Sequence, residues 1–154
     1  MQNEAAFLNK VPSWKNMTSE WERRILELRY RDSEKDDLEF VNLVDKAENH
    51  CDLDTCEILM KTFVTEEDFG IQESVNRVLS SASPENRQKA LLTELPRLIA
   101  DTPGWAYVLV ETEVRFHLNE LKQTLGNASA EQKNAIDQIF KQESFRRHFP
   151  NLNL

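Results

Sequence analysis

The residue types best suited to chemistry gather at Glu111, Glu113, His117 and Glu120. Glu113 and His117 are four residues apart, so on a helix they would share one face and could hold a metal ion together. A di-iron site needs a duplicated Glu-x-x-His motif and a zinc protease needs HExxH, and the sequence contains neither. We therefore expect an exposed Glu113–His117 pair, supported on the same helix by a Glu111–Arg115 pair.

The rest of the sequence offers little further chemistry. His50 with Cys51 or Cys56 is the only other cluster of metal-ligand types, and the two cysteines form no CxxC motif. We interpret them as small core residues in a reducing compartment. A GxSxG turn is absent, and three glycines in the whole chain argue against a phosphate-binding loop. The sequence predicts no catalytic residue, no metal and no cofactor.

The elements that would position these residues are helices. Apolar residues recur at helical spacing, and Ser83-Pro84 and Thr102-Pro103 each place a capping residue before a proline at the first helical position. Ser19 with Glu22 and Ser129 with Gln132 have the capping-box pattern. Pro96, late in its helix, should kink or divide it. The pattern predicts helices over residues 19–30, 33–48, 53–64, 70–81, 84–100, 103–125 and 129–140, the second one starting at Asp32 or Ser33.

Residues 105–116 fit two periodicities. Val108, Val110, Thr112, Val114 and Phe116 alternate as in a strand, but Trp105, Val108, Leu109, Thr112 and Phe116 also fit one side of a helix. We predict a helix, because Thr102-Pro103 starts one and no second strand is available to pair with.

The predicted fold is all-α, with seven or eight short antiparallel helices stacked as helical hairpins in a HEAT-like manner and no sheet. We expect a single helical domain over residues 1–154. Within it, residues 1–17 form an irregular N-terminal arm, with room for one turn of helix, whose Trp14 docks on the core. Residues 143–154 form a loose C-terminal tail made of a short helical turn and a loose end.

Charge is spread unevenly along the chain. The net charge is −8, and residues 32–73 hold 14 acidic residues against three lysines, a net of −11, so the remainder carries +3. A nucleic-acid binder would show the opposite sign on its contact face, and an anionic membrane would repel this one. The pattern favours a basic protein as partner. Without a signal-peptide pattern or a long apolar run, we expect a cytoplasmic protein.

The middle of the chain resembles the helical immunity proteins of bacterial polymorphic toxin systems. It is most similar to the kind called immunity protein 30, found beside contact-dependent growth-inhibition toxins. The resemblance covers about residues 59–140 and implies a protein that binds and blocks a toxin domain, with no catalytic residue carried over. The segments that carry the resemblance are Phe63 with residues 68–74, residues 91–98 with the Leu95-Pro96 pair, residues 102–106 with Pro103-Gly104-Trp105-Ala106, and residues 114–119.

Many such toxins are nucleases with basic clefts, and an acidic inhibitor would be steered to one. We therefore predict an acidic partner-binding surface for a cognate toxin domain. A helical adaptor with another role stays open as an alternative, as does a metal-dependent helical enzyme. The sequence leaves open the oligomeric state and whether the inhibitor plugs the toxin active site or binds beside it. The predicted partner-binding residues are Asp36, Asp37, Asp45, Asp52, Glu66, Glu67 and Asp68.

Overall fold

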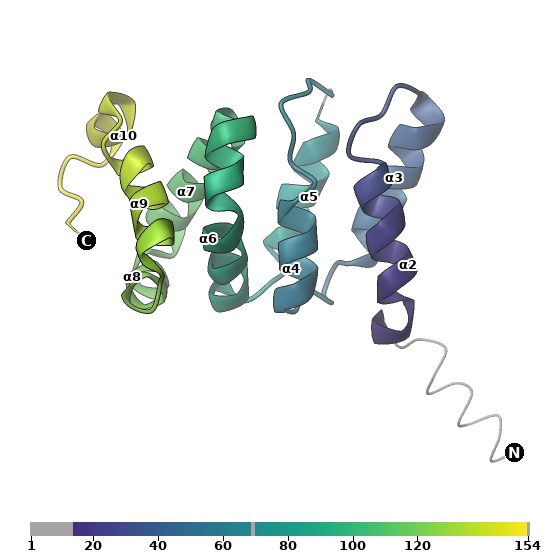
Figure 1. Cartoon of the computed structure of the whole chain (residues 1–154), viewed down its shortest axis with the longest axis horizontal. Coiled ribbons are helices and arrows are strands. Elements are labelled where there is room, and N and C mark those ends of the chain that lie inside the picture. The colour runs from purple at the N-terminus through teal and green to yellow at the C-terminus, as the bar shows by residue number, and fades with distance from the viewer. Residues whose placement is uncertain (1–13, 69, 154) are drawn as a thin grey trace, which may run out of the picture.

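The computed structural model describes residues 14–68 and 70–153, with side chains from Ser19 onward. Over these residues the chain forms nine helices and no strand, which confirms the predicted all-α class and the helix at residues 105–116. The helices stand in a row from the N-terminal to the C-terminal end (Figure 1). They are α2 (Trp14–Glu27), α3 (Glu34–Lys46), α4 (Leu53–Met60), α5 (Ile71–Leu79), α6 (Pro84–Asp101), α7 (Pro103–Phe116), α8 (Leu118–Gly126), α9 (Ala130–Phe140) and α10 (Glu143–His148).

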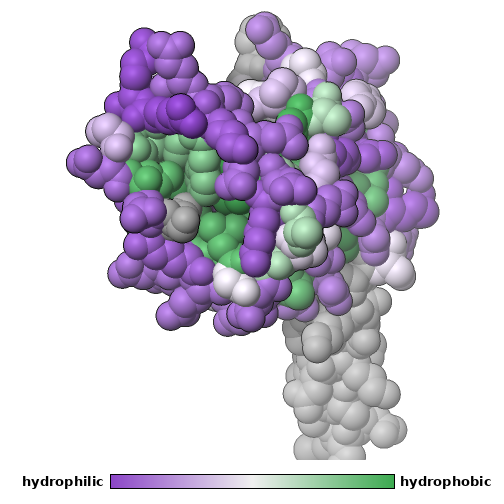
Figure 2. All heavy atoms as spheres, turned by 60° about the vertical axis from the view of Figure 1, so that its left-hand side comes forward, coloured by the Kyte–Doolittle hydropathy of each residue, from purple (hydrophilic) through white to green (hydrophobic). Residues whose placement is uncertain are grey.

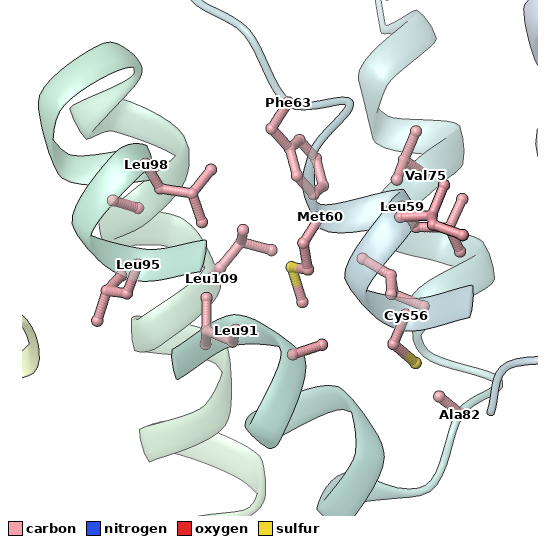
Figure 3. Packing of buried hydrophobic residues seen from close by; sticks show 14 of the residues in the cluster. Cys56, Leu59, Met60, Phe63, Val75, Ala82, Leu91, Leu95, Leu98 and Leu109 are labelled. Atoms are coloured by element: carbon pink, nitrogen blue, oxygen red, sulfur yellow. The ribbon is translucent and has the colours of Figure 1, made fainter. Parts of the chain in front are cut away.

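One hydrophobic core connects these helices, from Trp21 on α2 to Phe145 on α10. Helix α6 lies at its centre and packs against α4, α7, α8 and α9, while α3 packs against α5. Met60 and Phe63 lie between the α4–α5 pair and the α6–α7 pair, facing Leu91 and Leu98 (Figure 3). The longest helix is therefore held by buried leucines along much of its length.

Several helix starts agree with the sequence pattern because capping is a local interaction. Ser33, Asp52 and Ser83 accept hydrogen bonds from backbone amides at the starts of α3, α4 and α6. Ser129 and Gln132 form both bonds of the predicted capping box on α9. Gly70 precedes α5 with a φ of 92°, a left-handed conformation that glycine adopts without steric cost.

The predicted start of the first helix was wrong. Helix α2 begins at Trp14, so Ser19 lies inside the helix and does not cap it. The last residues of the predicted irregular arm over 1–17 are therefore helical. Residues 1–13 lie outside the described residues. The predicted docking of Trp14 on the core concerns a side chain that is also outside the described part of the structure.

Pro96 does not divide α6, which continues to Asp101. A proline inside a helix costs about 3 kcal/mol because it lacks an amide donor and crowds the preceding turn. Leu91, Leu95 and Leu98 on the same helix are almost completely buried. Burial of one leucine side chain contributes about 1.5–3 kcal/mol, so tertiary packing outweighs the local penalty.

The predicted long helix over 103–125 is two helices. Its first part ends at Phe116, His117 has a non-helical φ of −140° and ψ of 41°, and α8 starts at Leu118. This break and the helix at the C-terminus bring the described helices to nine, where seven or eight were expected.

The short helical turn predicted in the C-terminal tail is present, but the tail is not loose. Residues 143–148 form α10, and its Phe145 is 1% exposed. The Phe145 ring packs against Phe140 at 5.3 Å, Phe149 at 4.9 Å and Tyr107 at 5.6 Å between ring centroids. Aromatic burial of this kind attaches the tail to α7 and α9.

Among the described residues, no helix has the length and apolar character that crossing a membrane requires. Hydrophilic side chains dominate the face of the molecule shown in Figure 2, and hydrophobic ones show only in smaller areas between them. The exposed large hydrophobic side chains of the described region are Tyr30, Leu38, Val108 and Phe116.

Candidate functional site

The seven predicted partner-binding residues lie on neighbouring elements. Asp36, Asp37 and Asp45 belong to α3, and Asp52 caps α4. Glu66, Glu67 and Asp68 lie in the connection between α4 and α5. The structure does not bring all seven together: Arg31 joins Asp37 to Asp68, whereas Asp45 and Asp52 lie at the opposite ends of α3 and α4. We call the seven residues together the acidic surface.

Arg31 joins two members of the acidic surface. Its side chain is 2% exposed, and its guanidinium donates to Asp37 Oδ1 at 2.9 Å and to Asp68 Oδ2 at 2.6 Å. It also donates to the Leu28 carbonyl at 2.8 Å and lies over the Phe40 ring, 4.2 Å from the centroid. A buried guanidinium needs such partners, so Asp37 and Asp68 have a structural role.

Two more arginines form ion pairs with acidic residues of α3. Arg77 on α5 donates to Asp45 Oδ1 at 2.6 Å and to Glu48 Oε1 at 3.3 Å. Arg24 on α2 binds the Glu39 carboxylate with two of its nitrogens, and this contact holds the pKa of Glu39 below its ordinary value. When Arg24, Arg31 and Arg77 are counted with residues 32–73, the net charge of the region falls from −11 to −8.

The remaining members of the acidic surface differ in whether their carboxylates have partners within the protein. One Asp52 oxygen accepts from the Thr55 amide at 2.9 Å as the helix cap. Within the described structure Asp36, Glu66 and Glu67 form no ion pair; Asp36 is partly exposed and the two glutamates are exposed. Of the seven, these three carboxylates have neither an ion pair nor a helix-cap hydrogen bond in the described structure, so they are the most available to a partner.

The backbone under Glu66 and Glu67 is fixed by buried groups. Gln72 is buried, accepts from the Val64 amide at 2.7 Å and donates to the Glu66 carbonyl at 2.9 Å. Asp68 accepts from the Gln72 amide at 3.2 Å in addition to its bonds with Arg31. Thr65 donates its hydroxyl to the Asp101 carbonyl at the end of α6. Two exposed glutamates are thus presented from a connection whose flanking residues are hydrogen-bonded to α5, to α6 and to Arg31 between α2 and α3.

The expected exposed Glu113–His117 pair was wrong. Glu113 is buried and accepts from Arg87 at 2.8 and 3.0 Å and from Gln88 at 3.0 Å, while His117 offers only its carbonyl to Gln88. The predicted Glu111–Arg115 pair is present at 2.9 Å. Glu120 is exposed on α8. Sequence spacing placed Glu113 correctly on a helix, but its partner comes from another helix 26 residues earlier.

The cysteines behave as core residues. Cys51 and Cys56 are free thiols and both are buried. A hydrogen bond between the two thiols lowers the pKa of Cys51 and raises the pKa of Cys56, and burial raises the pKa of Cys56 further. His50, their neighbour, is exposed, and the described residues contain no group of three or more metal-ligand side chains arranged to hold an ion.

Sequence reasoning missed the arginines that belong to the acidic surface. Arg24, Arg31 and Arg77 lie outside the acidic segment, and Arg77 is 32 residues from Asp45. No local spacing signals such a pair. Comparisons with protein-family models, curated proteins and solved structures give no match for this chain.

Proposed function

We propose that this protein is a cytoplasmic immunity protein that binds and neutralises a cognate bacterial toxin domain through its acidic surface. The proposal agrees with the resemblance of residues 59–140 to helical immunity proteins. The observation that carries it is the presentation of Glu66 and Glu67. Both are exposed and form no ion pair within the described structure, and the buried Gln72 holds the carbonyl of Glu66 and the amide of Val64 just before them.

Anchoring matters because binding must otherwise order the contact loop. Ordering a loop or a long side chain costs free energy, and a pre-ordered backbone reduces that cost. Exposed carboxylates facing a basic cleft also accelerate association, since opposite potentials steer the two proteins together. The acidic surface is suited to recognition of a cationic protein by charge and by a fixed loop.

The test is association with a candidate cognate toxin domain, sought among the products of genes adjacent to the one for this protein. The double variant Glu66→Lys/Glu67→Lys should slow association and weaken protection of cells that produce the toxin. Asp68 is left unchanged because its bond to Arg31 supports the fold. The matched control, Glu131→Lys/Glu143→Lys, makes the same charge change at exposed positions on α9 and α10 and should have little effect.

Salt provides a second readout. Because the screening length is about 8 Å near physiological ionic strength, added salt should remove much of the rate advantage of the wild type over the Glu66/Glu67 variant. Equal association rates for the two double variants, or association that is insensitive to salt, would show that the acidic surface is solvated and takes no part in binding. Binding without protection of cells would favour an adaptor over an inhibitor.

A further inference from the structure

Two adjoining hollows separate α5 from α7. The larger, about 600 Å³, lies between Glu73 and Asn76 of α5 and the start of α7. The smaller, about 240 Å³, continues past Asn76 and Ser80 toward His117, with Arg87 and Glu113 in its lining. Asn76 lines both hollows, so together they form one groove, which we call the α5–α7 groove. It opens where α5 and α7 separate, whereas α4 and α6 pack closely together.

The α7 wall of the groove is apolar at its wider end. Trp105 is partly exposed and its ring packs on Phe63 at 4.5 Å between centroids, which holds it in place. Val108, one turn further along α7, is 42% exposed and lines the same hollow. Thr112 follows after another turn and lines the smaller hollow. Apolar surface displayed at helical spacing in a groove is the arrangement that binds the apolar side of another helix.

The opposite wall is polar, and this end of the groove is acidic. Glu73 and Asn76 of α5 face the apolar side chains of α7 across the larger hollow. Thr65 lines the same hollow and is followed directly by the exposed Glu66 and Glu67. A ligand seated on Trp105 and Val108 would therefore have carboxylates beside it, which favour lysine or arginine on its flank.

We infer that the α5–α7 groove binds an amphipathic helix with an apolar stripe and a basic flank, supplied by the partner protein. The apolar stripe covers Trp105 and Val108, and the basic flank faces Glu66, Glu67 and Glu73. From Pro103 to His117 the α7 wall is about 21 Å long at 1.5 Å per residue, which matches a helix of about 14 residues. That the partner is a toxin domain rests on the proposed function, whereas the ligand chemistry of the groove does not.

The test uses a designed ligand and two matched variants of the full chain. The probe is a fluorescein-labelled 14-residue peptide with leucines on one helical face and lysines on the other, measured by fluorescence anisotropy. A second peptide carries glutamates in place of the lysines. Val108→Asp places a charge in the groove, and Leu38→Asp makes the same change at a residue on α3 that is 66% exposed and outside both hollows.

The lysine peptide should bind the wild type and Leu38→Asp with equal affinity, and Val108→Asp about tenfold or more weakly, because a charge replaces an apolar anchor. Glu73→Lys, which changes the opposite wall, should also weaken binding. The glutamate peptide should not bind. Circular dichroism and urea unfolding of each variant establish that the fold persists. Since Val108 and Glu73 are both exposed on the surface, neither substitution opens a cavity in the core.

Other results would overturn the inference. These are no binding of the lysine peptide, equal binding by Val108→Asp and Leu38→Asp, or equal binding of the glutamate peptide. A wild-type dimer that Val108→Asp converts to monomer would assign the groove to a second copy of this chain. Binding of the toxin domain separates the two proposals. If Val108→Asp still binds the toxin domain, the proposed function stands but the groove is not its binding site. If the wild type binds the peptide but not the toxin domain, the groove inference stands and the proposed function fails.

Discussion

Arg87 on α6 and Glu113 on α7 form a buried ion pair joined at two points, with Nε–Oε2 at 2.8 Å and Nη2–Oε1 at 3.0 Å. Other hydrogen bonds surround this ion pair. Arg87 donates to the Ala82 carbonyl at 3.2 Å, and Gln88 donates to Glu113 and accepts from Thr124 on α8 at 2.9 Å. This network fixes the positions of α6, α7 and α8 relative to one another beside the α5–α7 groove.

Removing one side of this pair should be costly. Glu113→Ala leaves the Arg87 guanidinium buried without its counter-charge, so we expect about 3–5 kcal/mol lower free energy of unfolding. Urea unfolding monitored by circular dichroism measures the change. Glu111→Ala on the same helix removes only an exposed pair with Arg115 and should cost less than about 1 kcal/mol. Similar losses in the two variants would contradict the structural role of the pair.

Two phenylalanines provide a matched test of the C-terminal helix. Phe145→Ala should lower the free energy of unfolding by about 3–5 kcal/mol, because Phe145 is buried and its removal leaves a cavity. Phe116→Ala, at a side chain 69% exposed, should change stability by less than about 0.5 kcal/mol. Thermal or urea unfolding distinguishes them. If both are neutral, α10 does not contribute to the folded core.

Substitution of Asp68 should lower stability more than substitution of Glu67, although the two residues are adjacent. Arg31 would keep Asp37 and the Leu28 carbonyl as partners in Asp68→Asn, so the loss of one charged contact should cost about 1–3 kcal/mol. Glu67→Gln removes an exposed carboxylate without an ion pair in the described structure and should be close to neutral. Urea midpoints of the two variants give the comparison. A neutral Asp68→Asn would show that Arg31 does not require it.

Stability should fall in acid partly through Glu39. Its hydrogen bonds from Arg24 hold its folded pKa below the ordinary 4.5. A depressed carboxylate pKa means that the contribution to stability is complete above pH 4.5 and is lost as pH falls through the lower folded value. Arg24→Gln should therefore reduce the dependence of the urea midpoint on pH below about 4.5.

The control for that experiment is Arg29→Gln, since Arg29 donates to the Leu26 carbonyl and forms no carboxylate pair in the described structure. Its acid dependence should match the wild type. Because the Arg24 site is exposed to solvent, added salt should diminish the difference between the two variants. Identical pH profiles for Arg24→Gln and Arg29→Gln would show that the Arg24–Glu39 ion pair does not contribute to stability in solution.

Fold class and most helix starts could be predicted from the sequence because they depend on neighbouring residues. Ser33, Asp52 and Ser83 cap the amides that follow them, and Ser129 with Gln132 closes its box within one turn. Where a local signal did not end a helix, longer-range interactions competed with it. Pro96 remains inside α6 because Leu91, Leu95 and Leu98 on that helix are buried in the core.

The candidate site depended more on tertiary structure. The sequence determined how many carboxylates residues 32–73 contain, but not that Arg31 would neutralise Asp37 and Asp68 or that Arg77 would bind Asp45. It also could not pair Glu113 with Arg87, or show that Val108 faces a groove opposite Asn76. Capping and periodicity act within one or two turns of chain, whereas ion pairs and grooves depend on distances set by the packing of whole helices.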